Sequence, residues 1–348
     1  MKNSRLEKLD VVRGFTAFYV VLHHLFSQNF TIYGFDLTYV FRFGQEAVIV
    51  FFILSGIVVP LSYYKNIGKE NFFNYYIKKR FIRIYLPLLI ILLTNYILTP
   101  DLLNWKDLTG TLTMVQDLDK KPGNLFTPAF KNSPLWSLSY EWWFYLFFFF
   151  SQKIKLQFNQ NLIVTLFTIA GVLSYIYYPN TISRFIMYFS IWWSGKNIAD
   201  KYLLNQHYAK KMYLADLPLI LVTLILFFDN YEYILNINKL DGLGLSPFLE
   251  FRHHIGALFF IFVSRFLFFT DLIKKCLNPF KSIAPIAYSL YISHWFLIIT
   301  ANYLNNIFFN YYIKYFIYIS ICFFYCWIVE VKIYPYISKL ILKYNKNV

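Results

Sequence analysis

The sequence predicts an all-α membrane protein, a polytopic bundle of about ten transmembrane helices. Hydrophobic residues make up 58% of the 348 residues and charged residues only 15%, whereas a soluble domain would carry roughly 25% charge. The apolar residues form blocks of roughly twenty, which is long enough for a helix to cross a bilayer. Lysine and arginine gather in short clusters between these blocks, as the cytoplasmic loops of membrane proteins require.

The expected spans follow one another without an internal repeat, and no segment is typical of a separate soluble domain. Residues 1–348 are therefore expected to form a single integral membrane domain. A long loop at 100–134 separates the third and fourth spans, and Lys120-Lys121-Pro122-Gly123 within it predicts a turn. The spans are expected at 11–29, 45–64, 81–99, 135–151, 161–178, 181–199, 215–232, 252–270, 283–302 and 313–331.

The distribution of basic residues predicts the orientation of the chain. With the N-terminus inside, 22 of the 33 Lys and Arg residues fall on the inner side and 9 on the outer side, while Arg13 and Arg265 fall within spans. Because positive loops stay in the cytoplasm, both termini are predicted to be cytoplasmic and the 100–134 loop external. The net charge of +15 does not indicate a nucleic-acid partner, since the basic residues lie where cytoplasmic loops need them.

The three cysteines predict neither a disulfide framework nor a metal site. Cys322 and Cys326 are four residues apart on one helical face, and their neighbours are Phe and Tyr rather than further ligands. Buried packing is the better interpretation of this pair, and no bound metal is expected.

The first apolar segment carries two ionisable residues, Arg13 and His24, that a plain membrane anchor would exclude. Eleven residues make about three helical turns, so the two side chains share one face about 16 Å apart along the axis. An ionisable residue inside a span is a functional hypothesis by default. His24 beside a cavity would suit a general base; the alternative is a ring satisfied by a neighbouring helix. His23 points about 100° away, and the spacing from Arg13 favours His24.

Two further arginines, Arg80 and Arg83, stand just before the third expected span. They are three residues apart at a helix start and so share a face. Basic residues at this interface are typical of the positive-inside signal and of contacts with lipid headgroups. Two guanidinium groups at this spacing also suit a polyphosphate, whose oxygens they bind in bidentate fashion. Both interpretations stay open on spacing alone.

Polar residues also mark the fourth and ninth spans. Glu141, one turn after Ser137, opens an aromatic run at the external end of the fourth span, where it could face water, orient a histidine or bind a sugar hydroxyl. Tyr288, Tyr291 and His294 form a polar stripe in the ninth span, for which helix–helix contact is the alternative. In the second span, Ser55-Gly56 predicts close helix packing through small residues.

Together these segments resemble the acyltransferase-3 family of integral membrane O-acyltransferases. Leu9-Asp10-x-x-Arg13-Gly14 followed by His24 is similar to the family's opening motif, and the other segments match in order over most of the chain. The departures Val11-Val12, Ala47 and Ala287 remove no ionisable group. The later matching segments are Gly44 to Gly56 ending in Phe51-Phe52-Ile53-Leu54-Ser55-Gly56, Arg80-x-x-Arg83 with Pro87, Trp136-Ser137-Leu138-Ser139-Tyr140-Glu141-x-x-Phe144-Tyr145, and Tyr288-Ser289-Leu290-Tyr291-x-x-His294.

The resemblance implies transfer of an acyl group, usually acetyl from acetyl-CoA, to a hydroxyl of a cell-surface polysaccharide or glycoconjugate. It implies that Arg80 and Arg83 hold the CoA phosphates and that His24 deprotonates the acceptor or relays the acyl group. Arg13 would stabilise the oxyanion or position the thioester, and Glu141 would orient His24 or the acceptor. Acyl-CoA is then a substrate, and no tightly bound cofactor is expected. The residues expected to bind substrate are Trp136, Ser137, Tyr288, Tyr291 and His294.

The same features admit a second class, a polytopic transporter or flippase of a lipid-linked glycan. Against it, hydropathy shows no inverted repeat, and the arginine pair suits a nucleotide-bearing donor better. A non-catalytic scaffold would not require Arg13, His24 and Glu141 together. The expected partners are acyl-CoA, a cell-surface glycan or glycolipid acceptor and membrane lipids, and the expected location is the plasma (inner) membrane of a bacterium.

Overall fold

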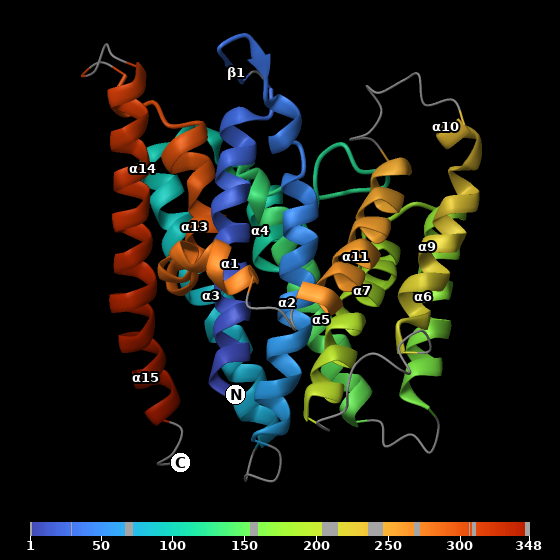
Figure 1. The fold of residues 1–348 in the computed structure, drawn as a ribbon. Helices are drawn as coiled ribbons and strands as arrows, with labels where there is room; N and C mark the ends of the chain where they lie inside the picture. Colours follow the sequence, from blue (N-terminus) through green and yellow to red (C-terminus); the bar gives the residue numbers. More distant parts are fainter. Residues whose placement is uncertain are drawn as a thin grey trace.

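The structure is a computed structural model that describes residues 2–28, 30–66, 72–153, 159–203, 215–235, 246–267, 272–305, 307 and 311–344. Its long helices run side by side in one bundle (Figure 1). Helix α1 begins and α15 ends at the same end of that bundle (Figure 1). This arrangement agrees with two termini on one side of the membrane, although the side itself stays a prediction.

The described helices follow the apolar blocks of the sequence, so the all-α fold class is confirmed. A two-stranded hairpin is the one exception in the described ranges, where β1 (Thr31–Ile32) pairs antiparallel with β2 (Phe35–Asp36) between α1 and α2. The helices are α1 (Lys2–Phe26), α2 (Gly44–Tyr64), α3 (Phe72–Leu98), α4 (Trp105–Leu112), α5 (Trp136–Lys153), α6 (Gln160–Tyr177), α7 (Thr181–Leu203), α9 (Leu217–Asp229), α10 (Tyr231–Leu235), α11 (Phe248–Leu267), α12 (Leu272–Leu277), α13 (Ala287–His294), α14 (Tyr311–Trp327) and α15 (Tyr334–Tyr344).

Short and π-helical segments connect these helices. Two π-helical segments, Trp295–Ile299 and Ile328–Ile333, continue α13 and link α14 to α15. Such wide turns are rare and frequently lie at functional sites. The 3₁₀ segments are Thr38–Phe41, Pro100–Leu102, Ala129–Lys131, Ser133–Leu135, Asn278–Ser282 and Ala284–Ile286.

The predicted count of ten membrane spans is not confirmed. Within the described ranges, five helical segments are long and apolar enough to cross a membrane, and a sixth if a pair bent by 51° around residue 283 counts as one span. Helix α9 has 13 residues, about 20 Å, which is short for a hydrocarbon core of about 30 Å. The five segments are Glu7–Phe26, Thr38–Tyr64, Phe72–Leu98, Gln160–Tyr177 and Ile313–Leu342.

Two glycines allow the close helix contacts that position the polar residues. A Cβ at Gly56 would lie 2.2 Å from the carbonyl oxygen of Trp192, so α2 and α7 touch along their backbones. This confirms the small-residue packing predicted at Gly56. A Cβ at Gly14 would lie 1.9 Å from the carbonyl oxygen of Phe280. Gly14 therefore lets α1 approach the segment that leads into α13, which brings the polar face of α1 beside the polar stripe of α13.

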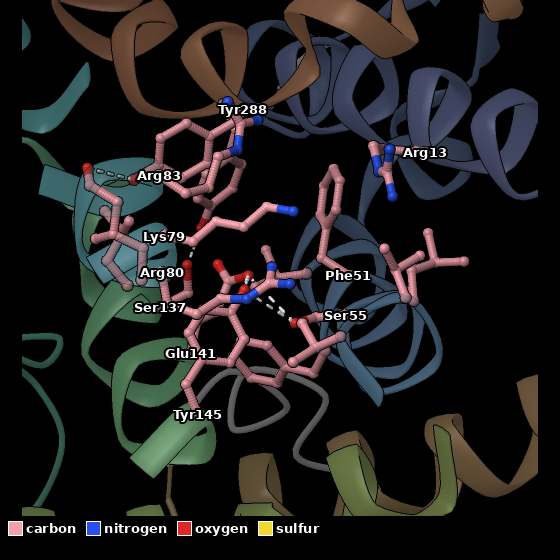
Figure 2. Close-up of a pocket in the computed structure, with 18 of the residues that line it drawn as sticks. Arg13, Phe51, Ser55, Lys79, Arg80, Arg83, Ser137, Glu141, Tyr145 and Tyr288 are labelled. Carbon is pink, nitrogen blue, oxygen red and sulfur yellow. Dashed lines mark hydrogen bonds between the residues drawn. The ribbon is translucent and has the colours of Figure 1, made fainter. Parts of the chain in front are cut away.

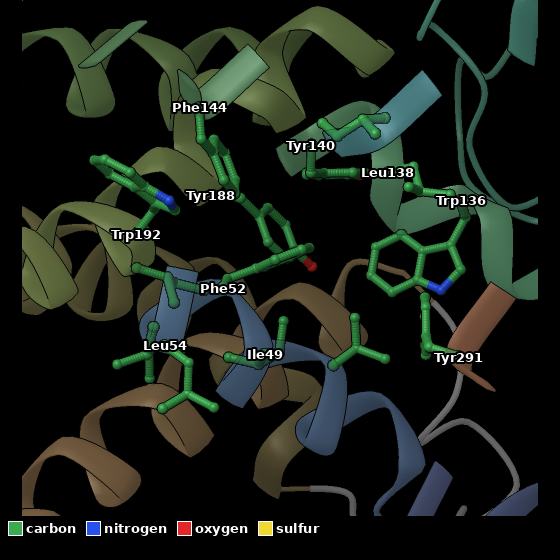
Figure 3. Close-up of a cluster of buried hydrophobic side chains, with 14 of the residues drawn as sticks. Ile49, Phe52, Leu54, Trp136, Leu138, Tyr140, Phe144, Tyr188, Trp192 and Tyr291 are labelled. Atoms are coloured by element: carbon green, nitrogen blue, oxygen red, sulfur yellow. The ribbon is translucent and has the colours of Figure 1, made fainter. Parts of the chain in front are cut away.

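An aromatic core holds α2, α5 and α7 together (Figure 3). The ring of Phe52 stacks on Tyr140 at 5.8 Å and meets Phe144 edge-on at 5.2 Å. Trp192 packs on the stacked ring of Phe189 at 5.7 Å. Aromatic pairs in these geometries contribute about 0.5–1.5 kcal/mol beyond the area that they bury. The rigid unit that results carries the side chains of α2 and α5 that face the site.

A buried ionic network anchors the 100–134 loop to this core. Arg184 is fully buried and donates to Asp117 with an Nε–Oδ2 distance of 2.9 Å. Tyr140 donates to the same oxygen at 2.6 Å, and the ammonium of Lys121 lies 3.9 Å from both Asp117 and Glu250. The predicted turn is present, since Lys121 N donates to Leu118 O and Gly123 has a φ of +67°. The network determines where the loop enters α5.

Replacement of Arg184 with methionine is expected to destabilise the protein strongly. Breaking a buried ion pair by removing one partner leaves the other charge uncompensated and costs about 3–5 kcal/mol. The free energy of unfolding in detergent micelles measures the effect. Lys281→Met is the control, because its ion pair with Glu7 is exposed and such pairs contribute about 0–1 kcal/mol. Equal losses in both variants would contradict a dominant role for the buried network.

Candidate active site

The start of α5 is held by hydrogen bonds that reach two neighbouring segments. Asn132 donates from Nδ2 to the carbonyl oxygen of Ile292 at 2.9 Å, and Gln116 donates to Leu135 O at 2.8 Å. The hydroxyls of Ser137 and Tyr291 lie 2.9 Å apart. These contacts fix the first turn of α5 against α13, so that the two predicted motifs that carry Glu141 and Tyr291 face one space.

That space is a partly open cavity of about 240 Å³ lined by residues of α1, α2, α3, α5, α13 and α15 (Figure 2). Its apolar wall comes from α2, which contributes residues over about three turns. Its other walls are polar and carry four cationic side chains and one carboxylate. The lining residues are Arg13, Val48, Phe51, Phe52, Leu54, Ser55, Val58, Val59, Lys79, Arg80, Arg83, Ile84, Ser137, Leu138, Glu141, Tyr145, Tyr288, Tyr291 and Tyr334.

Arg80 is the most exceptional of the cationic residues. It is buried, with 9% of its surface exposed, and its Nε has no hydrogen-bond partner. Its guanidinium lies 5.7 Å and 5.5 Å from the ring centres of Tyr76 and Tyr145. In the part of the chain that the structure describes, it has no acidic partner. An uncompensated buried charge is costly, so this position is suited to an anionic ligand.

Arg83 shares the cavity with Arg80, as their spacing predicted, but it has an acidic partner. Its Nη1 lies 2.6 Å from Oε2 of Glu330, which is 2% exposed. Both arginines lie within α3, which begins at Phe72, eight residues before Arg80. The expectation that they stand at a helix start is therefore wrong. The lipid-headgroup interpretation does not fit Arg80, because that side chain is buried among helices.

Arg13 reaches the cavity from α1, across from Lys79 and Arg80 (Figure 2). Its Nη1 lies 3.2 Å from Oδ1 of Asp10, one turn earlier on the same helix. Both side chains are partly exposed, at 31% and 46%, so the pair compensates the charge of Arg13 only weakly. The cavity therefore keeps an excess of positive charge.

Glu141 faces these cations from α5. Its Oε1 accepts hydrogen bonds from the hydroxyls of Tyr145 and Ser55, the latter at 3.2 Å. The described hydrogen bonds of Glu141 do not include one to His24, so the suggested orienting contact between them is absent from the described structure. Its oxygens instead point into the cavity that Arg80 lines, where a carboxylate can accept a hydrogen bond from a hydroxyl or amide of a ligand.

His24 lies beside a second histidine just outside the cavity. Its ring stacks on His294 at 5.2 Å and meets Trp295 edge-on at 5.0 Å. The Nδ1 of His294 is 3.1 Å from Leu290 O, and a carbonyl only accepts, so that nitrogen carries the proton. Its Nε2 is then a free acceptor, and it is buried without a partner. This ring can accept a proton.

Tyr291 connects the histidine pair to the cavity. Its hydroxyl reaches Ser137 within the cavity, and its ring lies 6.3 Å from that of His294. The ring of Phe51, another lining residue, is 5.7 Å away. His24 and His294 are thus separated from the cavity by one layer of side chains.

The structure therefore gathers most of the predicted site residues, although it separates one of them. Arg13, Arg80, Arg83, Glu141, Ser137, Tyr288 and Tyr291 line the cavity, and His24 and His294 adjoin it. Trp136 does not line it: its ring packs on Phe52 and Tyr140 and stacks on His253 at 6.4 Å. Its ring is buried in the aromatic core, so its predicted contact with substrate stays a prediction.

Sequence reasoning missed Glu330, Ser55 and Tyr145 as site residues. Glu330 is an acid within the last apolar block, and the rule that drew attention to Arg13 would have found it too. Ser55 and Tyr145 have no such signal, because hydroxyl groups are common in membrane helices. Among the described residues, no three His, Cys, Asp or Glu side chains are grouped as a metal site.

The fold and the cavity define an integral membrane protein whose helices line a polar, positively charged cavity. The chain belongs to the acyltransferase-3 family: that family's model, described as an acyltransferase domain, matches residues 6–331. The family's description favours an acyltransferase over the transporter considered above. It is also similar to Acyltransferase MdmB of Streptomyces mycarofaciens, at 33% identity over 155 residues. The match covers 41% of this chain and 38% of that relative. No solved structure matches the chain.

Proposed function

We propose that this protein transfers an acetyl or other acyl group from acyl-CoA to a hydroxyl of a cell-surface polysaccharide or glycoconjugate. The observation that carries the proposal is the buried, unpaired Arg80 in a cavity with four cations and one carboxylate. Acyl-CoA is a donor that combines phosphates with an apolar arm. The cationic wall from α3 suits the phosphates, and the apolar wall from α2 suits the arm.

In this proposal, Arg13 positions the donor rather than stabilising the oxyanion. It lies about 16 Å from His24 along α1, which is farther than its side chain can reach. Of the two roles that the family resemblance leaves open, this distance favours positioning of the donor over stabilisation of the oxyanion. Arg80 holds the donor phosphates together with Arg83, and Glu141 binds a polar group of the donor or acceptor within the cavity.

His24 is the proposed general base. It removes the proton from the acceptor hydroxyl, and the oxygen attacks the thioester carbonyl carbon. The new C–O bond forms as the C–S bond breaks, and the CoA thiolate leaves with the electron pair and takes up a proton. The stacked ring of His294, whose Nε2 is free, is a second proton acceptor beside it. A covalent acyl relay on His24 remains the alternative route to the same products.

The proposed setting is the plasma (inner) membrane of a bacterium, with both termini cytoplasmic. The clustered lysines and arginines support this orientation, as does the common end of the bundle at which α1 begins and α15 ends (Figure 1). The donor would enter from the cytoplasm. The acceptor would approach from the side of the 100–134 loop.

Radiolabelled acetyl-CoA incubated with purified protein and cell-surface glycan tests this function. Label that appears in the glycan, together with free CoA, is the expected result. Movement of a glycan across vesicle membranes without label would instead support a flippase. Mass spectra of surface glycan from cells with and without the protein identify the acceptor, because each transferred acetyl group increases the mass of the acceptor glycan by a fixed amount.

A further inference from the structure

We propose that Glu330 is a positioning residue, which holds the guanidinium of Arg83 in the cavity wall with one edge free for the anionic part of the donor. The inference rests on the proposed function for the identity of that anion. It adds a residue from the segment between α14 and α15, far from the other site residues in sequence.

The carboxylate of Glu330 is fixed at both oxygens. Oε2 accepts from Nη1 of Arg83 at 2.6 Å. Oε1 accepts from the backbone N–H and the hydroxyl of Ser289, at 3.3 Å and 3.2 Å. Because Glu330 is nearly completely buried, these are charge-assisted bonds in a low-dielectric setting. The bonds to Ser289 also tie the carboxylate to α13, which carries Tyr291 two residues later.

The guanidinium of Arg83 is in turn held between two aromatic rings. Its Cζ lies 4.8 Å from the ring centre of Tyr288 and 5.1 Å from that of Tyr334. Both tyrosines line the cavity, and the hydroxyl of Tyr288 is fixed to Ile84 O at 3.0 Å. A guanidinium has five N–H donors, and Glu330 accepts from one of them, on Nη1. In the proposal, the remaining donors bind a phosphate in the cavity.

The backbone around Glu330 departs from a regular α-helix. Glu330 lies in the π-helical segment Ile328–Ile333, where the helix has a wide turn. Wide turns of this kind frequently lie at functional sites. The two arginines thus have different settings: Arg83 is preorganised by a carboxylate, whereas Arg80 has none. Preorganisation reduces the entropy lost on binding.

Glu330→Gln keeps the shape of the side chain and removes its charge. We expect this variant to raise KM and the directly measured Kd for acetyl-CoA about 3- to 10-fold, with kcat changed by less than about 2-fold, because only ground-state positioning of the donor is lost. Titration calorimetry and steady-state assays on purified full-length protein in detergent provide the three constants. Asp200→Asn is the matched control, since Asp200 also forms a 2.6 Å ion pair, with Lys196, away from the cavity.

The outcomes separate the inference from the proposed function. Wild-type protein that binds no acetyl-CoA would overturn the proposed function and the inference with it. If wild-type protein binds acetyl-CoA and folded Glu330→Gln binds it equally well, the inference alone is overturned. The inference is also overturned if Glu330→Gln has a lower melting temperature and a lower kcat but an unchanged KM for acetyl-CoA. If Glu330→Gln does not fold, the same assays on Ser289→Ala test the inference. This substitution removes the hydrogen bond from the Ser289 hydroxyl to Oε1 of Glu330 and leaves the ion pair with Arg83. A smaller rise in KM supports the inference, and an unchanged KM overturns it.

Discussion

Replacement of His24 with alanine is expected to lower acyl transfer at least about 100-fold, because a positioned general base contributes about 10²–10⁴-fold to such reactions. The loss should appear in kcat, while the amount of protein in the membrane stays normal. The ring of His24 packs on His294 and Trp295, so its removal leaves a gap beside α13 rather than an unpaired charge. Transfer of radiolabel from acetyl-CoA to glycan, at matched protein levels, measures the effect.

The neighbouring histidine provides the control for this prediction. His23 is on the same helix, but its Nδ1 donates to the carbonyl of Phe41, and its edge packs against Gly44. His23→Gln is therefore expected to retain most of the transfer. Near-normal transfer by the His24→Ala variant would remove the proposed base. A comparable loss in both variants would attribute the effect to the packing of α1 rather than to proton transfer.

The helical fold could be predicted from the sequence because its signal is local. Blocks of apolar residues of the right length identify helices regardless of which segments pack against them. The number of true membrane spans could not be predicted in the same way. Helix α7 carries Arg184, which is satisfied by Asp117 from a distant loop, and α11 carries Glu250 beside Lys121. Whether such helices cross a membrane depends on these tertiary partners, which no single block reveals.

The candidate site could be predicted in part, where a residue is unusual in its own segment. Arg13, His24 and the arginine pair attract attention because charges are rare in spans. Their partners could not be predicted, because partnership is a property of packing. The spacing of Arg80 and Arg83 makes them equivalent, yet Glu330, which lies 247 residues from Arg83, pairs with only one of them. Trp136 similarly shares a motif with Ser137, but adjacent residues on a helix face different directions, and Trp136 faces the core.

The same substitution at two buried arginines is expected to have opposite consequences for stability and for donor binding. Arg80→Met removes a guanidinium that has no acidic partner among the described residues and whose Nε is unsatisfied. The melting temperature of the ligand-free protein should therefore not fall, because the substitution removes the desolvation cost of a buried charge that has no ionic partner. The affinity for acetyl-CoA should fall at least about 10-fold, since a hydrogen bond to a charged group contributes about 1.5–3 kcal/mol.

Arg184→Met is the comparison, because that arginine is also buried but is paired with Asp117 outside the cavity. It should lower the melting temperature, and the protein that remains folded should bind acetyl-CoA with normal affinity. Ligand-induced stabilisation separates the two effects in one experiment, since binding to the folded state raises the melting temperature with ligand concentration. That rise should be lost in Arg80→Met and kept in Arg184→Met. An unchanged rise in Arg80→Met would show that this guanidinium balances the charge of Glu141 across the cavity instead of binding the donor.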